Sequence, residues 1–366
     1  MKNIFFHFQQ VGGANALLPL INFLNVDYNI TISARDLVFC NLTKRGIDAI
    51  KLEIKTDTDT LLNHYSPDIV ITDSIDLSRT SESIICKNIW KSSQIKNIPC
   101  IAYVDCWWAY KERFYLPGET ITNLPDIIGV IDSVAQKEML KCDFDKQHIE
   151  ILGSPAYEIL SLKKITQIEK KRELGYSKDV YIVIFVSQPM EKYFGSESEW
   201  GFTEKTVLKE LIETLSYIPD NIKKSFLMVV LLHPEDDEHE ISAIIKSENT
   251  DIKIVLSHSH RSLDYVIAGD LITGMFSILL SEAVILNRLV IPIQLNLKKQ
   301  DMLITDKIGA TVPVRKKQHL SSHFLKAIVN ENYRRTLLCQ QKKFEVVKDS
   351  IFRWKRTINR LTSRNG

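Results

Sequence analysis

The sequence has 366 residues, of which 45% are hydrophobic and 25% are charged, and its 47 basic and 45 acidic residues give a formal charge of +2. This length is sufficient for two domains that each bury a core of their own. The nearly balanced charge argues against a nucleic-acid-binding protein, and no stretch reaches the roughly 18 apolar residues of a membrane span.

Six cysteines are spread along the chain without a CxxC pair or the spacing of metal ligands. Isolated thiols of this kind are typical of a reducing compartment rather than of a disulfide framework. The chain starts with a strand-like run and lacks an apolar segment followed by a small-residue cleavage site, so we predict no signal peptide. We expect a cytoplasmic enzyme that uses neither a metal ion nor a cofactor.

The first half alternates short β-rich runs with helical stretches, the order expected of a parallel sheet covered by helices. The predicted strands cover residues 3–8, 28–34, 49–54, 69–72, 99–104, 127–131 and 148–152, and the predicted helices cover 16–24, 37–45, 84–95 and 134–140. We assign residues 1–153 to an N-terminal α/β domain. The Lys-rich, weakly apolar residues 154–178 are interpreted as a linker.

A glycine pair, Gly12 and Gly13, follows the first predicted strand. Glycine allows a ligand to approach the backbone closely at the carboxyl edge of a parallel sheet, so we interpret the pair as part of a binding loop. The full G-x-G-x-x-G dinucleotide motif is absent.

The strand at 99–104 runs directly into a polar and aromatic segment. Asp105, at the tip of this strand, is a candidate general base for an acceptor hydroxyl. The aromatic rings of Trp107, Trp108 and Tyr110 suit stacking against sugars, and Arg113 suits pairing with a carboxylate or a phosphate. The alternative is structural: the two tryptophans pack against a neighbouring helix, and Asp105 caps it.

The strand pattern restarts at residue 180, and we assign residues 179–340 to a second α/β domain. Its predicted strands cover 180–186, 226–232, 254–256, 271–273 and 289–293, and its predicted helices include 205–218 and 278–287. Polar residues again follow the strands: Ser187 and Gln188 the first, His233 and Pro234 the second, and His258 the third.

The most informative turn has the sequence Gly-Met-Phe-Ser, from Gly274 through Met275 and Phe276 to Ser277. Gly274 permits a tight turn and Ser277 is a good N-cap, so the following helix presents free N–H groups and a positive dipole end to an anion such as phosphate. Glu282, about one turn further on, is placed to accept hydrogen bonds from a ribose. The alternative is an ordinary strand–helix junction in which Ser277 only caps and Glu282 is solvated.

Residues 341–366 include a basic helical segment at 344–361. We expect it to pack across the domains, and the alternative is peripheral contact with the inner face of an anionic membrane. Ligands of doubly wound sheets bind outside the carboxyl ends of the strands, so the polar strand tips named above are predicted to line one cleft between two facing domains.

This order of elements resembles the GT-B architecture of glycosyltransferases, a superfamily that also holds the non-hydrolysing UDP-N-acetylglucosamine 2-epimerases. The resemblance implies two Rossmann-like domains, a sugar nucleotide held by the C-terminal one, and a terminal helix that crosses back onto the N-terminal one. The glycine pair, the turn at 274–277 and the terminal helix occupy the matching places. The usual histidine after the first glycine loop is missing, and Asn15 stands nearby.

A narrower resemblance is to bacterial sialyltransferases and Kdo transferases that use CMP-activated sugars. It rests on the pair His233-Pro234 and on Ser277, and it implies that His233 contacts the nucleotide phosphate and assists its departure. His258, in the same domain, is expected to border the nucleotide base.

The predicted function is therefore metal-independent transfer of a sugar from a nucleotide-activated donor, such as a CMP-sugar, to a surface-glycan or lipid-linked acceptor. Asp105 and His233 are the predicted catalytic residues, and Trp107, Trp108, Tyr110 and Arg113 the acceptor site. The nucleotide-sugar site is assigned to Gly12, Gly13, Ser187, Gln188, His233, Pro234, His258, Gly274, Met275, Phe276, Ser277 and Glu282. Two alternatives stay open: a UDP-sugar 2-epimerase or hydrolase, and a non-catalytic GT-B-like binding protein.

Overall fold

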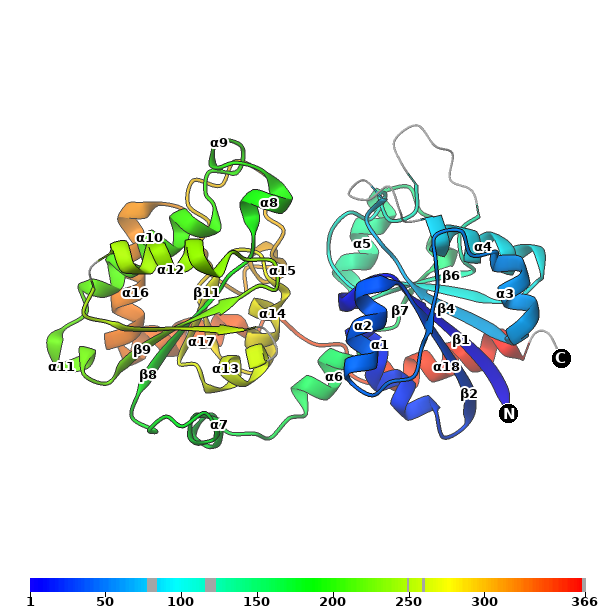
Figure 1. Ribbon diagram of the computed structural model, residues 1–366, viewed down its shortest axis with the longest axis horizontal. Helices are drawn as coiled ribbons and strands as arrows, with labels where there is room; N and C mark the ends of the chain where they lie inside the picture. Colours follow the sequence, from blue (N-terminus) through cyan, green and yellow to red (C-terminus); the bar gives the residue numbers. More distant parts are fainter. Residues whose placement is uncertain (78–83, 116–122, 249, 259–260, 364–366) are drawn as a thin grey trace. The chain divides into compact units, whose positions relative to one another are not determined.

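The computed structural model describes residues 1–77, 84–115, 123–248, 250–258 and 261–363. The chain forms two compact units, which we call unit 1 (Met1–Leu162 with Val346–Gly366) and unit 2 (Lys163–Glu345) (Figure 1). The expected linker at 154–178 is largely helical: α6 (Pro155–Ser161) is part of unit 1, and α7 (Gln167–Glu173) is part of unit 2. Both helices have side-chain caps, from Ser154 and Thr166.

Unit 1 is built on a parallel sheet of seven strands in the order β3-β2-β1-β4-β5-β6-β7. The strands are β1 (Lys2–Phe8), β2 (Tyr28–Ala34), β3 (Ile50–Lys51), β4 (Ile69–Asp73), β5 (Cys100–Val104), β6 (Ile127–Val130) and β7 (Ile149–Ile151). The helices are α1 (Val11–Leu24), α2 (Asp36–Lys44), α3 (Thr58–Tyr65), α4 (Ile84–Ile95), α5 (Ser133–Lys141), α6 and α18 (Ser350–Thr362), with a short 3-10 helix at Lys146–His148. The edge strand β3 is shorter than the predicted 49–54.

Helices cover both faces of this sheet. Trp90 of α4 donates a hydrogen bond to Thr72 on one face, whereas Trp354 of α18 packs edge-on against Tyr103. Tyr103 is in register with Asp73, the residue after Thr72, so it points to the opposite face from Thr72. Helices α4 and α18 therefore enclose the sheet from opposite sides.

Helix α18 returns from the end of unit 2 to pack on unit 1, as the red ribbon in Figure 1 shows. Its apolar stripe is buried and includes the fully enclosed Trp354 and Ile358. Ion pairs of Lys355 with Asp27 and of Arg360 with Glu150 tie its polar edges to the same unit. Phe352 is 58% exposed on the outer side. Membrane contact through this helix stays a prediction, and within the described residues no helix is long and apolar enough to cross a bilayer.

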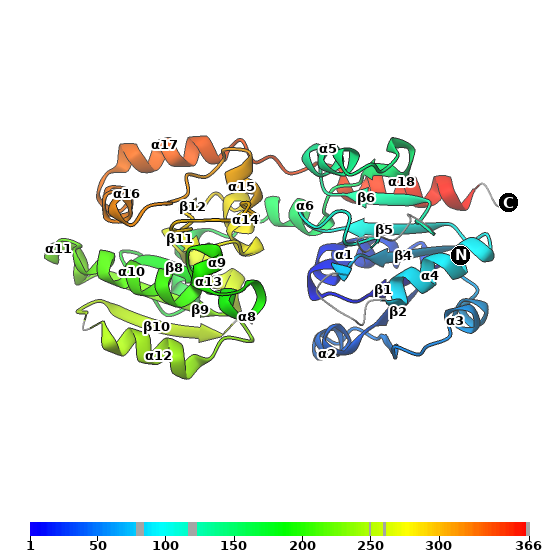
Figure 2. The same cartoon turned by 90° about the horizontal axis from the view of Figure 1, so that it is seen from above.

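Unit 2 has a parallel sheet of five strands in the order β10-β9-β8-β11-β12, drawn from above in Figure 2. The strands are β8 (Tyr181–Val186), β9 (Phe226–Leu232), β10 (Lys253–His258), β11 (Leu271–Gly274) and β12 (Leu289–Val290). The helices are α7, α8 (Met190–Phe194), α9 (Glu197–Trp200), α10 (Glu204–Ser216), α11 (Asp220–Lys223), α12 (Glu238–Ser247), α13 (Ser262–Ala268), α14 (Ile278–Ile285), α15 (Ile304–Lys307), α16 (Lys317–Val329) and α17 (Glu331–Gln341). The central strands are buried on both faces, as their unbroken apolar runs predict.

Candidate functional site

Each sheet has a point at which the direction of strand order reverses, between β1 and β4 in unit 1 and between β8 and β11 in unit 2. The loops that leave the carboxyl ends of two such strands go to opposite faces and open a crevice, which is the usual ligand position in sheets of this kind. Residues that follow these four strands are therefore the first candidates for function in each unit.

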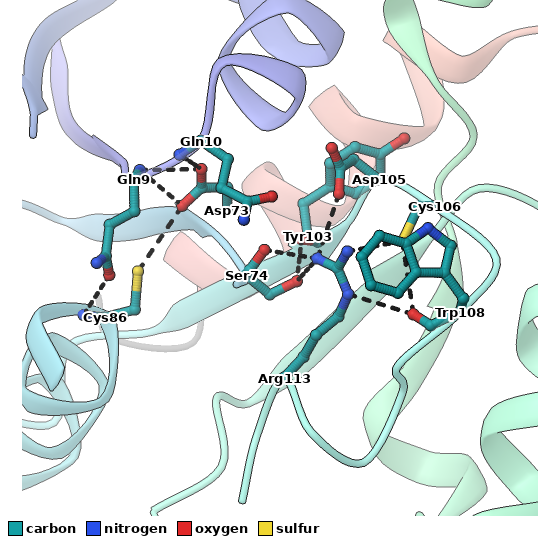
Figure 3. Close-up of polar contacts among 10 residues, drawn as sticks. All are labelled: Gln9, Gln10, Asp73, Ser74, Cys86, Tyr103, Asp105, Cys106, Trp108 and Arg113. Carbon is teal, nitrogen blue, oxygen red and sulfur yellow. Dashed lines mark hydrogen bonds and ion pairs between the residues drawn. The ribbon is translucent and has the colours of Figure 1, made fainter. Parts of the chain in front are cut away.

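In unit 1 the glycine pair lies in the first turn of helix α1, not in the expected loop at 9–15. Just before the helix, the carboxylate of Asp73, at the end of β4, accepts hydrogen bonds from the backbone N–H groups of Gln9 and Gln10 at 2.7–3.0 Å (Figure 3). A Cβ on Gly13 would lie 2.5 Å from the Cβ of Asp73, so only glycine permits this contact.

Asp73 is fully buried, and this burial raises its pKa to about 7, opposed by the N–H groups of Gln10 and Gln9. The Sγ of Cys86 lies 3.7 Å from its second oxygen. Both oxygens of Asp73 accept hydrogen bonds, and its side chain has no exposed surface, so we interpret its role as structural. It is not placed to meet a substrate.

Asp105, after β5, is partly exposed at this edge, with 11% of its side chain accessible. Its Oδ2 lies against Gly12, where a Cβ would stand 2.8 Å away. Gly12 itself is exposed, in the first turn of α1, whose N-terminal dipole favours a negative charge. The second oxygen, Oδ1, lies 3.3 Å from Nη1 of Arg113. One oxygen of the carboxylate is thus paired with Arg113, and the other packs against the backbone of Gly12.

Arg113 is a structural clamp rather than a surface ligand. It is almost fully buried, and its Nη1 donates to the carbonyl and hydroxyl oxygens of Ser74 at 2.6 and 3.1 Å. Its Nη2 lies 2.6 Å from Sγ of Cys106, and its Nε donates to the carbonyl of Trp108 (Figure 3). The guanidinium also lies over the Trp108 ring, 5.4 Å from the ring centre. These contacts join the end of β4 to the segment that carries Asp105.

The other aromatic residues expected to meet an acceptor are also turned inward. Trp107 is 4% exposed, donates from Nε1 to Asp132 at 2.7 Å and stacks with Tyr157. Tyr110 is 7% exposed. Trp108 is half-buried and is the one of the four predicted acceptor residues with substantial surface. The structural alternative therefore describes Trp107, Tyr110 and Arg113 better than stacking on a sugar does.

In unit 2 the residues after β8 meet the turn after β11. Gly274 pairs with Val186 so closely that a Cβ would lie 2.8 Å from the Val186 carbonyl oxygen. The backbone N–H of Phe276 donates to Oε1 of Gln188 at 3.3 Å. Met275 is fully buried, and Ser277 caps α14 by accepting from the N–H of Leu279. The turn is thus fixed from both neighbouring strands.

Two further residues at this edge have free hydrogen-bonding capacity. The hydroxyl of Ser187 is buried and has no hydrogen-bond partner among the described residues. Glu282, on α14, is partly enclosed, and this burial raises its pKa to about 7, opposed by Lys163. A carboxyl that titrates near neutral pH can donate as well as accept a hydrogen bond.

His233 follows β9, and its ring is half-buried. Its Nδ1 accepts a hydrogen bond from the backbone N–H of Glu235 at 3.2 Å, so the neutral ring carries its proton on Nε2. Burial lowers the pKa of His233, opposed by Asp236 and Glu235. Pro234 lies in the turn that makes this contact. The ring is therefore a fixed, neutral hydrogen-bond donor at the edge of the sheet.

A pocket of about 260 Å³ opens beside this histidine. It is lined by Pro189, Glu191, Lys192, Glu204, Lys205, Glu235, Asp236, Asp237, Glu240 and Ile241. Six carboxyl groups against two lysines make this pocket unfavourable for a polyanion. The turn after β11, by contrast, leads into the N-terminal end of α14, whose dipole favours an anion.

His258 lies apart from these residues. It ends β10, the edge strand two positions from β8, and its exposed ring is 3.6 Å from Glu238. Its predicted contact with a nucleotide base stays untested. In the part of the chain that the structure describes, no group of three or more His, Cys, Asp or Glu residues is arranged to hold a metal ion.

Comparisons with known proteins place the fold. No protein-family model and no curated protein matches the sequence. Among solved structures, the chain is similar to UDP-GlcNAc 2-epimerase from Neisseria meningitidis bound to UDP-GlcNAc, with a TM-score of 0.68 over 99% of this chain and 100% of that one at 14% identity. The chain has the GT-B fold.

Two other solved structures agree with this assignment. MurG from Acinetobacter baumannii matches with a TM-score of 0.62 at 9% identity, and Anabaena Alr3699/HepE in complex with UDP with a TM-score of 0.62 at 12% identity. Each covers 99% of this chain and 100% of its own. The predicted α/β class with two Rossmann-like sheets is confirmed. At these identities the likeness extends to the fold alone.

Proposed function

We propose that this chain is an enzyme that acts on a nucleotide-activated sugar, with Asp105 as its acid–base group. The observation that carries the proposal is the setting of Asp105: a partly exposed carboxylate, held by a buried arginine, beside an exposed glycine in the first turn of α1. The fully buried Asp73 supports this helix from beneath. Such a positioned carboxylate is suited to moving a proton to or from a substrate.

Unit 2 would hold the nucleotide. Support comes from the fixed turn of residues 274–277, the unpaired hydroxyl of Ser187 and the neutral His233. Similar solved structures bind UDP-GlcNAc or UDP, which favours a uridine nucleotide over the CMP-sugar of the narrower resemblance.

Two reactions suit this arrangement. Epimerisation beside the anomeric carbon needs a group that removes a ring proton and a group that returns one, and the likeness to several epimerases favours this reaction or the related hydrolysis. Glycosyl transfer needs a base for the acceptor hydroxyl while the nucleotide leaves, and the likeness to MurG favours it. In both, Asp105 would exchange the proton and His233 would donate a hydrogen bond to the departing phosphate.

Binding is tested first, by calorimetry of the full chain with UDP, CMP, GDP and ADP. We expect selective binding of UDP that is weakened by His233→Ala and by Glu282→Ala. If no nucleotide binds, or if both variants bind as well as the parent, the assignment of the nucleotide to unit 2 is wrong.

Turnover is tested next, with UDP-GlcNAc in deuterated water followed by NMR. Deuterium in a ring C–H bond without an acceptor would identify an epimerase, free sugar a hydrolase, and nucleotide release only with an added glycan a transferase. Asp105→Asn should lower the rate on the order of 10²-fold or more. Asp143→Asn, at a residue whose side chain is 83% exposed, is the control and should retain the parent rate. Nucleotide binding without turnover would favour the non-catalytic alternative.

A further inference from the structure

A buried polar cluster lies directly behind the Gly274–Ser277 turn in unit 2. Gln294 follows the extension of β12, where the N–H of Ile293 donates to the carbonyl of Gly274 at 2.8 Å. Gln294 is fully buried, and its Nε2 lies 3.1 Å from the carbonyl oxygen of Met275. The carboxamide therefore holds the turn from inside.

The same Nε2 is also 3.1 Å from Oδ1 of Asp301 and 3.1 Å from Oδ2 of Asp306. A carboxamide nitrogen carries two hydrogens, which is one fewer than these three acceptors require. The Oε1 of Gln294 is buried and has no partner among the described residues. The orientation of the amide therefore depends on the acceptors that its Nε2 contacts. A proton on one carboxyl supplies the missing donor, because that carboxyl can then donate to the other.

The surroundings identify which carboxyl carries the proton. Asp301 accepts from the N–H of Leu303 at 2.9 Å and lies 2.6 Å from Nη2 of Arg315, so its oxygens already face donors. Asp306 has the hydroxyl of Thr311 as its other partner, and the charged groups that act on it are Asp301 and Arg315. Burial, reinforced by Asp301, raises the pKa of Asp306 to about 8.

We propose that Asp301 and Asp306 share one proton and that the shared proton keeps Gln294 bonded to Met275, which positions the Gly274–Ser277 turn for the phosphate of a nucleotide. Loss of this proton places two negative charges against one amide group. The carboxylates then separate, Gln294 follows one of them, and the carbonyl of Met275 loses its donor. The ligand part of this inference rests on the proposed function, whereas the control of the turn does not.

The test measures calorimetric binding of UDP to the full chain between pH 7 and 9.5. If binding requires the shared proton, the affinity of the parent should fall about tenfold per pH unit above pH ~8. Asp306→Asn keeps a neutral partner at this position and should bind with the affinity of the parent at pH 7, with no fall at higher pH. Asp264→Asn, a carboxylate on α13 that is paired with Lys170, is the control and should follow the parent.

A second variant tests the direction of the effect. The Thr311 hydroxyl lowers the pKa of Asp306 by bonding to its ionised form. Thr311→Val removes this bond, so the loss of affinity should begin at a higher pH than in the parent. A purely structural role for the cluster would weaken binding at every pH and would not move the midpoint.

Hydrogen exchange of the backbone amides of residues 275–279, without ligand, separates the two proposals. After correction for intrinsic rates, the parent should lose protection between pH 7 and 9.5, and Asp306→Asn should retain it. If this difference appears but UDP does not bind at any pH, the proposed function fails and the control of the turn stands. If protection or affinity changes equally in the parent and in Asp306→Asn, the inference is overturned.

Discussion

Two aspartates of unit 1 accept backbone hydrogen bonds at the start of a helix, one buried and one exposed. Asp73 accepts from Gln9 and Gln10 beneath α1, and Asp57 accepts from Asp59 and Thr60 at the N-terminus of α3. Their hydrogen bonds are alike, but only Asp73 is shielded from water. The burial of each carboxylate therefore decides how much its hydrogen bonds contribute to the free energy of unfolding.

We expect Asp73→Ala to lower the free energy of unfolding by about 2–4 kcal/mol, because it removes a buried carboxylate and leaves the partly buried N–H groups of Gln9 and Gln10 without their acceptor. Asp57→Ala is the matched control and should cost far less, since water replaces the lost acceptor. Urea denaturation followed by circular dichroism measures both. Equal losses in the two variants would show that burial of the N–H groups is not the cause.

At the scale of elements, helix α18 is held by its apolar stripe. Trp354 is fully buried between Tyr103 and Gly129, whereas Phe352, two residues earlier, is 58% exposed. Trp354→Ala should destabilise unit 1 by about 3–5 kcal/mol through the cavity that it leaves. Phe352→Ala should change the unfolding free energy much less. A small effect of Trp354→Ala in thermal and urea unfolding would mean that α18 does not contribute to the core.

The elements that could be predicted from the sequence are those whose signal is local. Unbroken apolar runs marked the central strands, and the three-to-four-residue spacing of apolar side chains marked α18. The contact that fixes the chain just before α1 could not be predicted, because Asp73 is 64 residues away from Gln9. The sequence also did not distinguish buried from exposed aromatic residues around Asp105.

The same limit applies to the candidate sites. The turn of residues 274–277 was recognisable from Gly274 and Ser277, which act on their own neighbours. The cluster behind it was not, since Gln294, Asp301 and Asp306 meet only through the tertiary fold. A polar Gln294 at the end of an apolar run was its one visible signal.

For the molecule as a whole, buried titratable groups set the dependence of stability on pH. Burial raises the pKa of Asp73 and Glu282 to about 7 and that of Asp306 to about 8. Protons bound to these groups stabilise the folded state, and this contribution to the free energy of unfolding is lost as the pH rises through the raised pKa values. Burial lowers the pKa of His7 to about 3, so its contribution is lost as the pH falls below its ordinary value of 6.5. The carboxyl contribution therefore declines from the ordinary range of these groups, about pH 4, up to pH 7–8, and above pH 6.5 His7 no longer opposes this decline.

We therefore expect the urea midpoint to fall as the pH rises from 6.5 to 8, because the folded chain still binds protons that the unfolded carboxyls have released, and to level off above pH ~8. Asp306→Asn should reduce this fall, because its side chain does not titrate. Denaturation at several pH values and constant ionic strength measures the trend. A midpoint that is flat or rises over this range would contradict it.

The path of the chain also affects how the protein is made. Unit 2 is inserted between the two segments of unit 1, at residues 163–345. On a ribosome, which releases the chain from its N-terminus, every part of unit 2 emerges before α18 does. The surface of the seven-stranded sheet beneath Trp354 therefore stays uncovered until helix α18 (Ser350–Thr362) has emerged. Unit 1 therefore cannot complete its core until unit 2 has been synthesised, and the apolar surface beneath Trp354 stays open to water for that time.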